Sequence, residues 1–220
     1  MSPTTTRILV WDAPTRIFHW SLAASFTGAY LTAESERWRD VHVMLGYTLL
    51  GLIAFRLVWG LIGTRYARFV SFAFGPRQVV EYVRSLLSPA PRHYVGHNPA
   101  GSWAIYVMLG LGALAGASGY AGYADIGGEW MEDLHEGLAS AMLGIVVIHV
   151  LGVIVSSLIH RENLTRSMIT GYKAGPASQG IRRAWWTVGA AVVGLAIAFW
   201  SGVVPAPGLA PTAQVAQVHR

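Results

Sequence analysis

The stretch "HEGLASAMLGIVVIH", residues 135–149, is an almost uncharged apolar run with a histidine at each end. In a helix of about 1.5 Å rise and about 100° turn per residue, these two side chains would lie roughly 21 Å apart along the axis and about 40° apart in direction. Both imidazoles would therefore share one face of the helix at two depths. Because ionisable groups inside a membrane are costly, this placement suggests a function.

The composition of the whole chain permits either a large soluble core or a bundle of membrane helices, and the distribution of polar residues decides between them. The chain contains 220 residues, of which 53% are apolar. A span needs about 20 apolar residues to cross roughly 30 Å of hydrocarbon. Five stretches come near that length, and we predict an all-α membrane protein with spans at about 17–33, 41–63, 103–124, 134–159 and 184–204.

The charged residues predict the orientation of these spans. Twelve of the 16 Lys and Arg residues lie in 1–16, 64–100 and 160–183, whereas eight of the 11 acidic residues lie in 34–40 and 125–136. Basic segments face the cytoplasm in membrane proteins. We therefore expect a cytoplasmic N-terminus and a C-terminal tail on the outside. The net charge of +5 is explained by this topology, and we expect no nucleic-acid partner.

The connecting segments carry three further expectations. The first residues lack a basic region leading into an apolar run and a cleavage site, so no signal peptide is expected and the first span should stay in the mature protein. The loop sequence "PRQVVEYVRSLL" predicts a short amphipathic helix at the cytoplasmic interface. Residues 205–220 are rich in Pro and Ala and predict a mobile periplasmic tail.

The chain contains no cysteine. This composition excludes disulfides, thiolate-bound iron–sulfur clusters and haem attached through a Cys-x-x-Cys-His motif. Any cofactor must be held by other ligands.

Four histidines fall inside the predicted spans, and the topology predicts their depths. His19 and His149 lie toward the cytoplasm and form the inner pair, while His42 and His135 lie toward the outside and form the outer pair. Two imidazoles at one level are what a six-coordinate, non-covalent b haem requires. Zinc is the competing metal, but structural zinc sites usually need four ligands and each level offers two histidines.

Other residues near the histidines have two interpretations each. Glycines in the second span (Gly46, Gly51, Gly60) and in the fourth (Gly137, Gly144, Gly152) would make room for a macrocycle or allow close helix packing. Arg56 would balance the propionates of the inner haem or extend to the headgroups. Of the remaining histidines, His93 and His97 lie in the cytoplasmic loop, and His160 lies at the interface as a rival inner ligand.

Four motifs flank or occupy the predicted spans. They are "APTRIFHW" before the first span, "RHYVGHNPAG" before the third, the two fourth-span histidines, and "HRENLTRSMITGYK" after the fourth. Together they resemble the bacterial cytochrome b561 family, which includes the cytochrome b subunits of membrane-bound nickel–iron hydrogenases. The resemblance covers roughly residues 8–175.

This resemblance implies a domain organisation and a cofactor content. Residues 1–175 would form a four-helix bundle with two b haems in the bacterial inner membrane, residues 184–204 a fifth transmembrane helix, and residues 205–220 the periplasmic tail. By position, His19 and His149 match the inner haem's ligands, and His42 and His135 match those of the outer haem. The implied function is electron transfer between a periplasmic partner and membrane quinone.

Two departures bear on the partner. The connection "DIGGEWMEDLHE" looks short compared with hydrogenase subunits, and a fifth span follows the family core. Both favour another donor, such as a c-type cytochrome, over a hydrogenase. The acidic outer loops would suit a basic electron carrier, although ordinary membrane sidedness also explains them.

Three functions follow from these features. The leading hypothesis is a dihaem electron-transfer protein of the respiratory chain, with Arg16, Trp20, Arg56, His97 and Asn98 as candidates for lining a quinone site near the inner haem. The alternative is a stand-alone superoxide:quinone oxidoreductase, for which Arg37 and Arg39 near His42 would attract the anion. The third is a non-redox membrane scaffold or transporter.

Overall fold

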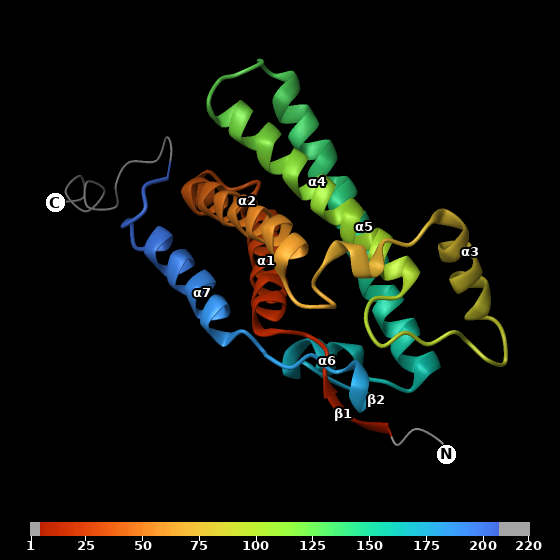
Figure 1. The fold of residues 1–220 in the computed structure, drawn as a ribbon. Coiled ribbons are helices and arrows are strands. Elements are labelled where there is room, and N and C mark those ends of the chain that lie inside the picture. Colours follow the sequence, from red (N-terminus) through yellow and green to blue (C-terminus); the bar gives the residue numbers. More distant parts are fainter. Residues whose placement is uncertain (1–4, 207–220) are drawn as a thin grey trace.

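The computed structural model describes residues 5–206, and this part of the chain is mostly helical (Figure 1). The helices are α1 (Ala13–Thr32), α2 (Arg39–Ile62), α3 (Pro76–Ser85), α4 (Pro99–Tyr123), α5 (Trp130–His160), α6 (Leu164–Thr170) and α7 (Trp186–Trp200). Short 3-10 turns are η1 (Glu36–Trp38), η2 (Phe69–Phe72) and η3 (Ala177–Gln179), and the two strands are β1 (Thr5–Leu9) and β2 (Tyr172–Pro176).

All five predicted spans are helical, but they differ as membrane spans. By length and composition, three helices could cross a membrane: Glu36–Ile62, which joins η1 to α2, Pro99–Tyr123 and Trp130–His160. Helix α1 has 20 residues but does not meet the same hydropathy criterion. Helix α7 is apolar but has only 15 residues, which gives about 22 Å at 1.5 Å per residue. The described residues therefore contain a helical membrane protein with three clear spans.

The helices begin earlier than hydropathy alone predicts because they are capped. The Asp12 carboxylate accepts a hydrogen bond from the Thr15 amide at 2.8 Å, and α1 follows at once. The Asn98 side chain likewise accepts from the Gly101 amide at 2.7 Å and caps α4. Such caps satisfy amides that have no partner inside a helix. The expected amphipathic loop helix is confirmed as α3.

The helices pack in pairs. In Figure 1, α4 and α5 lie side by side, and α1 and α2 form a second pair with α7 along its flank. Contacts between α2 and α4 join the two pairs. Helix α5 is not packed comparably closely against α1 or α2, although all four predicted ligand histidines lie on these three helices.

A small antiparallel sheet, which the sequence analysis did not predict, closes one end of this mostly helical molecule. Strand β1 pairs with β2, with Ile8 opposite Lys173. The backbone amides of Val10 and Trp11 then donate to the Gly171 carbonyl at 2.8 and 3.0 Å. Pairing partners more than 160 residues apart leave no periodic signal in either segment alone.

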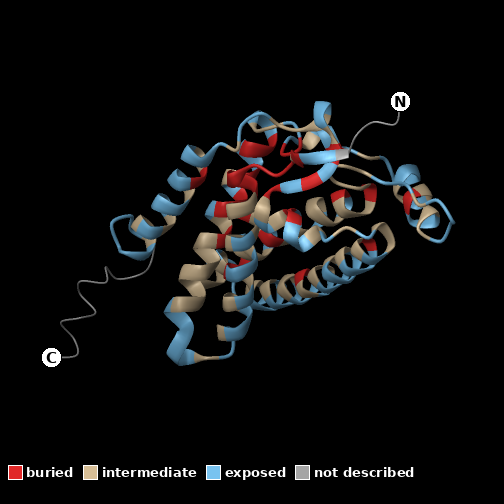
Figure 2. Cartoon of the chain, turned by 90° about the horizontal axis from the view of Figure 1, so that it is seen from below, coloured by how far each residue is buried: buried red, intermediate tan, exposed pale blue. Residues whose placement is uncertain are grey.

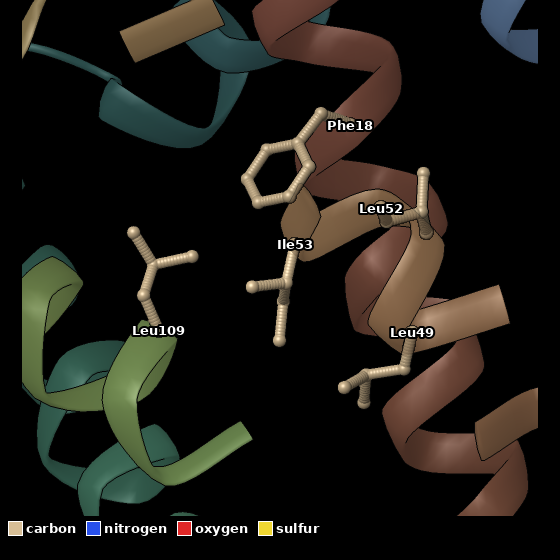
Figure 3. Packing of buried hydrophobic residues seen from close by; sticks show 5 residues of the cluster. All are labelled: Phe18, Leu49, Leu52, Ile53 and Leu109. Carbon is tan, nitrogen blue, oxygen red and sulfur yellow. The ribbon is translucent and has the colours of Figure 1, made fainter. Parts of the chain in front are cut away.

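Two hydrophobic clusters support this arrangement. Phe18, Leu49, Leu52, Ile53 and Leu109 form one, and Figure 3 shows them where α1, α2 and α4 meet. Ile8, Val10, Trp11 and Tyr66 form the other, beneath the sheet. Figure 2 shows that buried positions gather near the strands, while the far ends of the helices are largely exposed or intermediate. That end of the protein therefore has its own folded core.

Candidate functional site

Four histidine side chains meet as two pairs between the helices. The ring centres of His42 on α2 and His135 on α5 are 6.0 Å apart, with an angle of 82° between the ring planes. Those of His19 on α1 and His149 on α5 are 6.4 Å apart, at 54°. The first is the outer pair and the second is the inner pair that the depths of the histidines along the spans predict.

The spacing of the rings can be compared with the spacing that ligation of one metal ion requires. A metal–imidazole bond is about 2 Å long and the ring centre lies roughly 1.1 Å behind the nitrogen, so two opposed imidazoles on one ion have centres about 6.2 Å apart. Both observed separations lie within a few tenths of an ångström of this value. The separation of each pair is therefore compatible with two imidazoles on one metal ion, as in bis-imidazole haem ligation.

Backbone carbonyls fix the tautomers of the outer pair. His42 Nδ1 lies 2.9 Å from the carbonyl oxygen of Ala29, and His135 Nδ1 lies 2.8 Å from that of Ala115. Because a carbonyl only accepts, each Nδ1 carries the proton and each Nε2 keeps its lone pair. This is the usual arrangement of a metal-binding histidine, whose other nitrogen donates to a supporting group.

Helix α4 supplies space for the outer pair without contributing a histidine. A hollow of about 250 Å³ is lined by both outer histidines and Gly119, and by Arg39 and Glu132 in the first turns of α2 and α5. A second, smaller hollow of about 60 Å³ adjoins the same pair and is lined by Gly46 and Gly116, among others. A Cβ built on Gly119 would lie 2.8 Å from His135 Nδ1. The imidazole therefore needs glycine at this position.

The glycines singled out in the sequence fall into different environments. Gly46 lines a hollow beside the outer pair. Gly60 is buried, and any Cβ there would collide with the ring of Phe69, so it serves helix and aromatic packing. The other four, Gly51, Gly137, Gly144 and Gly152, are exposed and have open space at the Cβ position.

Buried polar atoms without partners surround the inner pair. His19 Nδ1, Arg56 Nη1 and His97 Nδ1 are all buried and make no hydrogen bond. Arg56 is only 2% exposed, and its guanidinium lies 4.7 Å from the centre of the Phe69 ring. It therefore does not extend to the surface. Orphaned polar atoms of this kind are costly unless a ligand satisfies them, which marks this region as a candidate binding site.

His97 lies between aromatic rings near this site. Its ring centre is 4.6 Å from Trp11 and 4.3 Å from Phe72. Burial lowers the pKa of His97 to about 3, and the charges of Arg56 and Lys173 act in the same direction. The imidazole is therefore neutral at physiological pH and can donate one hydrogen bond and accept another.

The other candidates for a quinone site lie in two places. Arg16 Nη1 donates to the Ile169 carbonyl at 2.6 Å, and the exposed Trp20 donates to the Met168 carbonyl at 3.3 Å, so both anchor α1 to α6. Trp20 also contacts His19, with ring centres 5.0 Å apart. Asn98 is engaged as the cap of α4.

A site with more protein ligands does not form in the described part of the chain. Within residues 5–206, no group of three or more His, Asp or Glu side chains is placed to hold a metal ion. His160, the rival inner ligand, lies beside His93 instead, with ring centres 5.3 Å apart. Each histidine pair thus offers two imidazoles, fewer than the four ligands usual for structural zinc and equal to the two that a bis-imidazole haem requires.

Fold and site together define a helical membrane protein with paired imidazoles at two depths. The family model for prokaryotic cytochrome b561 matches residues 10–171. The chain therefore belongs to the prokaryotic cytochrome b561 family. This membership agrees with the resemblance found in the motifs and disfavours the hypothesis of a non-redox scaffold.

Several curated proteins are similar over most of the chain. The probable Ni/Fe-hydrogenase B-type cytochrome subunit of Azotobacter chroococcum mcd 1 is 28% identical, over 76% of this chain and 89% of its own length. The protein of the same name from Azotobacter vinelandii is 27% identical over the same shares, and that from Rhodobacter capsulatus is 23% identical over 76% and 82%. No solved structure gives a significant match.

Proposed function

We propose that this protein is a dihaem b-type cytochrome that transfers electrons between a redox partner outside the membrane and membrane quinone. His19 and His149 would hold the inner haem, and His42 and His135 the outer one. The observation that carries the proposal is the separation of the ring centres, 6.4 and 6.0 Å, in two pairs that share α5. When bound, haem supplies reversible one-electron exchange at iron.

The chain's own residues have distinct tasks in this proposal. Helix α5 carries one ligand of each pair, fourteen residues apart, so it spaces the two centres by roughly 21 Å along its axis. The carbonyls of Ala29 and Ala115 orient the outer imidazoles. Arg56 is the buried counter-charge for the inner haem's propionates, as its unpartnered nitrogen suggests.

The proposed membrane arrangement keeps five spans. Helix α1 completes a four-helix core, and α7 is the fifth transmembrane helix. Residues 1–175 form the haem domain in the bacterial inner membrane, with the N-terminus in the cytoplasm. Helix α7 lies within the predicted fifth span, residues 184–204, and packs against α1. The tail, residues 205–220, would be periplasmic, and most of it lies outside the described residues.

The external partner is proposed from two sources. The similar proteins are named as cytochrome subunits of Ni/Fe hydrogenases, which favours a hydrogenase or another redox enzyme subunit. The short acidic stretch at residues 125–136 also favours a c-type cytochrome, which we propose as the second possible partner. Glu36 and Glu132 line the hollow at the outer pair and would attract a basic carrier.

Quinone would react close to the inner pair. His97, with its buried Nδ1, is the proposed hydrogen-bonding group, and Arg16, Trp20 and Asn98 are proposed to shape the surroundings. Changing His97 to Ala should impair quinone turnover and leave both haem spectra intact. Loss of a haem in this variant would refute the placement.

The alternative function, direct oxidation of superoxide at the outer haem, has one supporting observation. Arg39 lines the hollow beside His42 and His135. Glu36 and Glu132 line it too, so the hollow is not distinctly cationic. Quinone reduction by superoxide with purified protein alone would favour this alternative over a partner-dependent cytochrome.

Reduced pyridine-haemochrome spectra test the proposed function on the purified chain. Haem per protein would be measured in the parent and in the His135→Ala and His149→Ala variants. We expect two b haems in the parent and the loss of a different one in each variant. One haem or none in the parent would show that at least one histidine pair serves packing only.

A further inference from the structure

A cluster of titratable side chains lies at the end of α5 nearer to the inner pair. Glu162 Oε2 is 3.1 Å from Lys173 Nζ and 3.3 Å from His93 Nε2. His160 completes the cluster through its ring contact with His93. The four residues come from the loop before α4, the end of α5, the turn before α6 and strand β2.

Burial increases stepwise through the cluster. The His93 side chain is 44% exposed, that of Glu162 is 18% exposed and that of Lys173 is 2% exposed. Lys173 also reaches the carbonyl of Tyr94 at 3.4 Å, whereas Glu162 Oε1 is buried without a partner. The cluster therefore connects a solvent-facing imidazole with a half-buried carboxylate whose buried Oε1 has no hydrogen-bond partner.

The buried side of the cluster points toward the inner site. Lys173 sits on β2, whose neighbour β1 runs directly into Trp11, the residue that packs on His97. The positive charge of Lys173 also acts on His97, so the cluster is electrostatically coupled to the imidazole proposed to bind quinone.

We propose that His93, His160, Glu162 and Lys173 form the proton-exchange site of the quinone reaction. This inference rests on the proposed function. Reduction of one quinone to quinol takes two electrons, supplied by the external redox partner, and two protons, supplied by water through this cluster; oxidation of quinol returns both. His93 exchanges protons with solvent, and the carboxylate of Glu162 passes them inward. Lys173 balances the buried charge of Glu162.

A purely structural role would also explain part of the geometry, because Glu162 links the end of α5 to β2. The two roles differ in what they affect. A structural clamp influences folding and haem content, whereas proton exchange influences only reactions that release or take up protons.

The experiment compares two reductants of the haems by stopped-flow absorbance, using the full chain in detergent. Decylubiquinol releases protons as it delivers electrons, whereas dithionite reduces haem without quinone. The variants are His93→Ala and Glu162→Gln. Arg92→Ala is the matched control, because Arg92 adjoins His93 in sequence but pairs with Glu81 at the surface.

We expect both variants to keep the parent's haem content and its reduction by dithionite. Their reduction by decylubiquinol at pH 7 should be slower by about a hundredfold, the lower end of the range for lost acid–base groups. Added imidazole should restore the rate of His93→Ala, and Arg92→Ala should match the parent.

Three results would overturn the inference. Parent rates with decylubiquinol in both variants would show that the cluster carries no protons. Loss of haem in both would assign the cluster to the structural clamp. A parent that contains haem and reacts with dithionite but not with decylubiquinol would instead refute the proposed quinone reaction, and this inference with it.

Discussion

Replacing Gly119 by alanine should weaken the outer haem site without weakening the fold. A Cβ at this position would lie 2.8 Å from His135 Nδ1 and 2.9 Å from Cε1, whereas ordinary contact begins at 3.4 Å. The imidazole would have to move by about 0.6 Å, the difference between 3.4 and 2.8 Å. That shift strains or breaks its hydrogen bond to the Ala115 carbonyl.

The expected magnitude follows from the lost support of the ligand. Removing such a supporting contact typically costs 10–100-fold in metal affinity, about 1.4–2.8 kcal/mol. The same substitution favours the helix itself by roughly 0.8–1 kcal/mol, because alanine has the higher helix propensity. Haem affinity and fold stability should therefore change in opposite directions, which a general packing defect would not produce.

Haem titration of the stripped protein, haem content and thermal unfolding would measure both effects. Gly110→Ala is the matched control, since it lies on the same helix and a Cβ there meets no atom within 4 Å. We expect Gly119→Ala to lose one haem selectively and Gly110→Ala to keep both. Parent affinity for both haems in Gly119→Ala would refute the placement of this glycine beneath an outer ligand.

Three more predictions concern the end of the molecule that holds the inner pair. Asp12 accepts hydrogen bonds from Trp59 Nε1 at 3.1 Å and Thr64 Oγ1 at 2.6 Å in addition to capping α1; Asp12→Ala should therefore cost several kcal/mol by lost cap and hydrogen bonds, and Asp12→Asn clearly less, in thermal or denaturant unfolding. Folding lowers the pKa of His97 to about 3, so between about pH 6.5 and pH 3 the unfolded chain binds a proton at His97 that the folded chain does not. The contribution of His97 to stability is therefore complete above about pH 6.5 and falls by roughly 2 kcal/mol by pH 5. His97→Gln should accordingly lose less stability than the parent between pH 7 and 5, and equal losses would contradict the burial of its ring. Arg56→Leu removes a buried positive charge and should lower the midpoint potential of one haem by an amount on the order of tens of millivolts; a redox titration in which both potentials stay unchanged would show that Arg56 is not near a haem.

The sequence alone determined the helices, the depths of their histidines and the pairing of those histidines. These features are local or additive: an apolar run long enough to cross a bilayer specifies a helix, and the alternation of basic and acidic loops orients it. The pairing of His19 with His149 and of His42 with His135 then follows from position along antiparallel spans. The cap residues Asp12 and Asn98 could also have fixed the helix starts, since each precedes a proline-containing first turn.

Only the tertiary structure decided which groups support those histidines. The carbonyls of Ala29 and Ala115 have no side-chain signature, so their role depends on how α1 and α4 pack against the neighbouring helices. Gly119 and Gly137 both lie inside apolar helices, but a Cβ at Gly119 would meet a histidine, whereas Gly137 is exposed with open space around it.

The small sheet and the cluster around Glu162 also depend on the tertiary structure, because both join residues that are far apart in the chain. Ile8 meets Lys173, and Glu162 meets His93, across long separations in the chain. A periodic pattern reports only which face of an element is apolar, whereas these contacts depend on where distant elements come together. The helices and the positions of their histidines are thus encoded locally, and the surroundings of those histidines arise from folding.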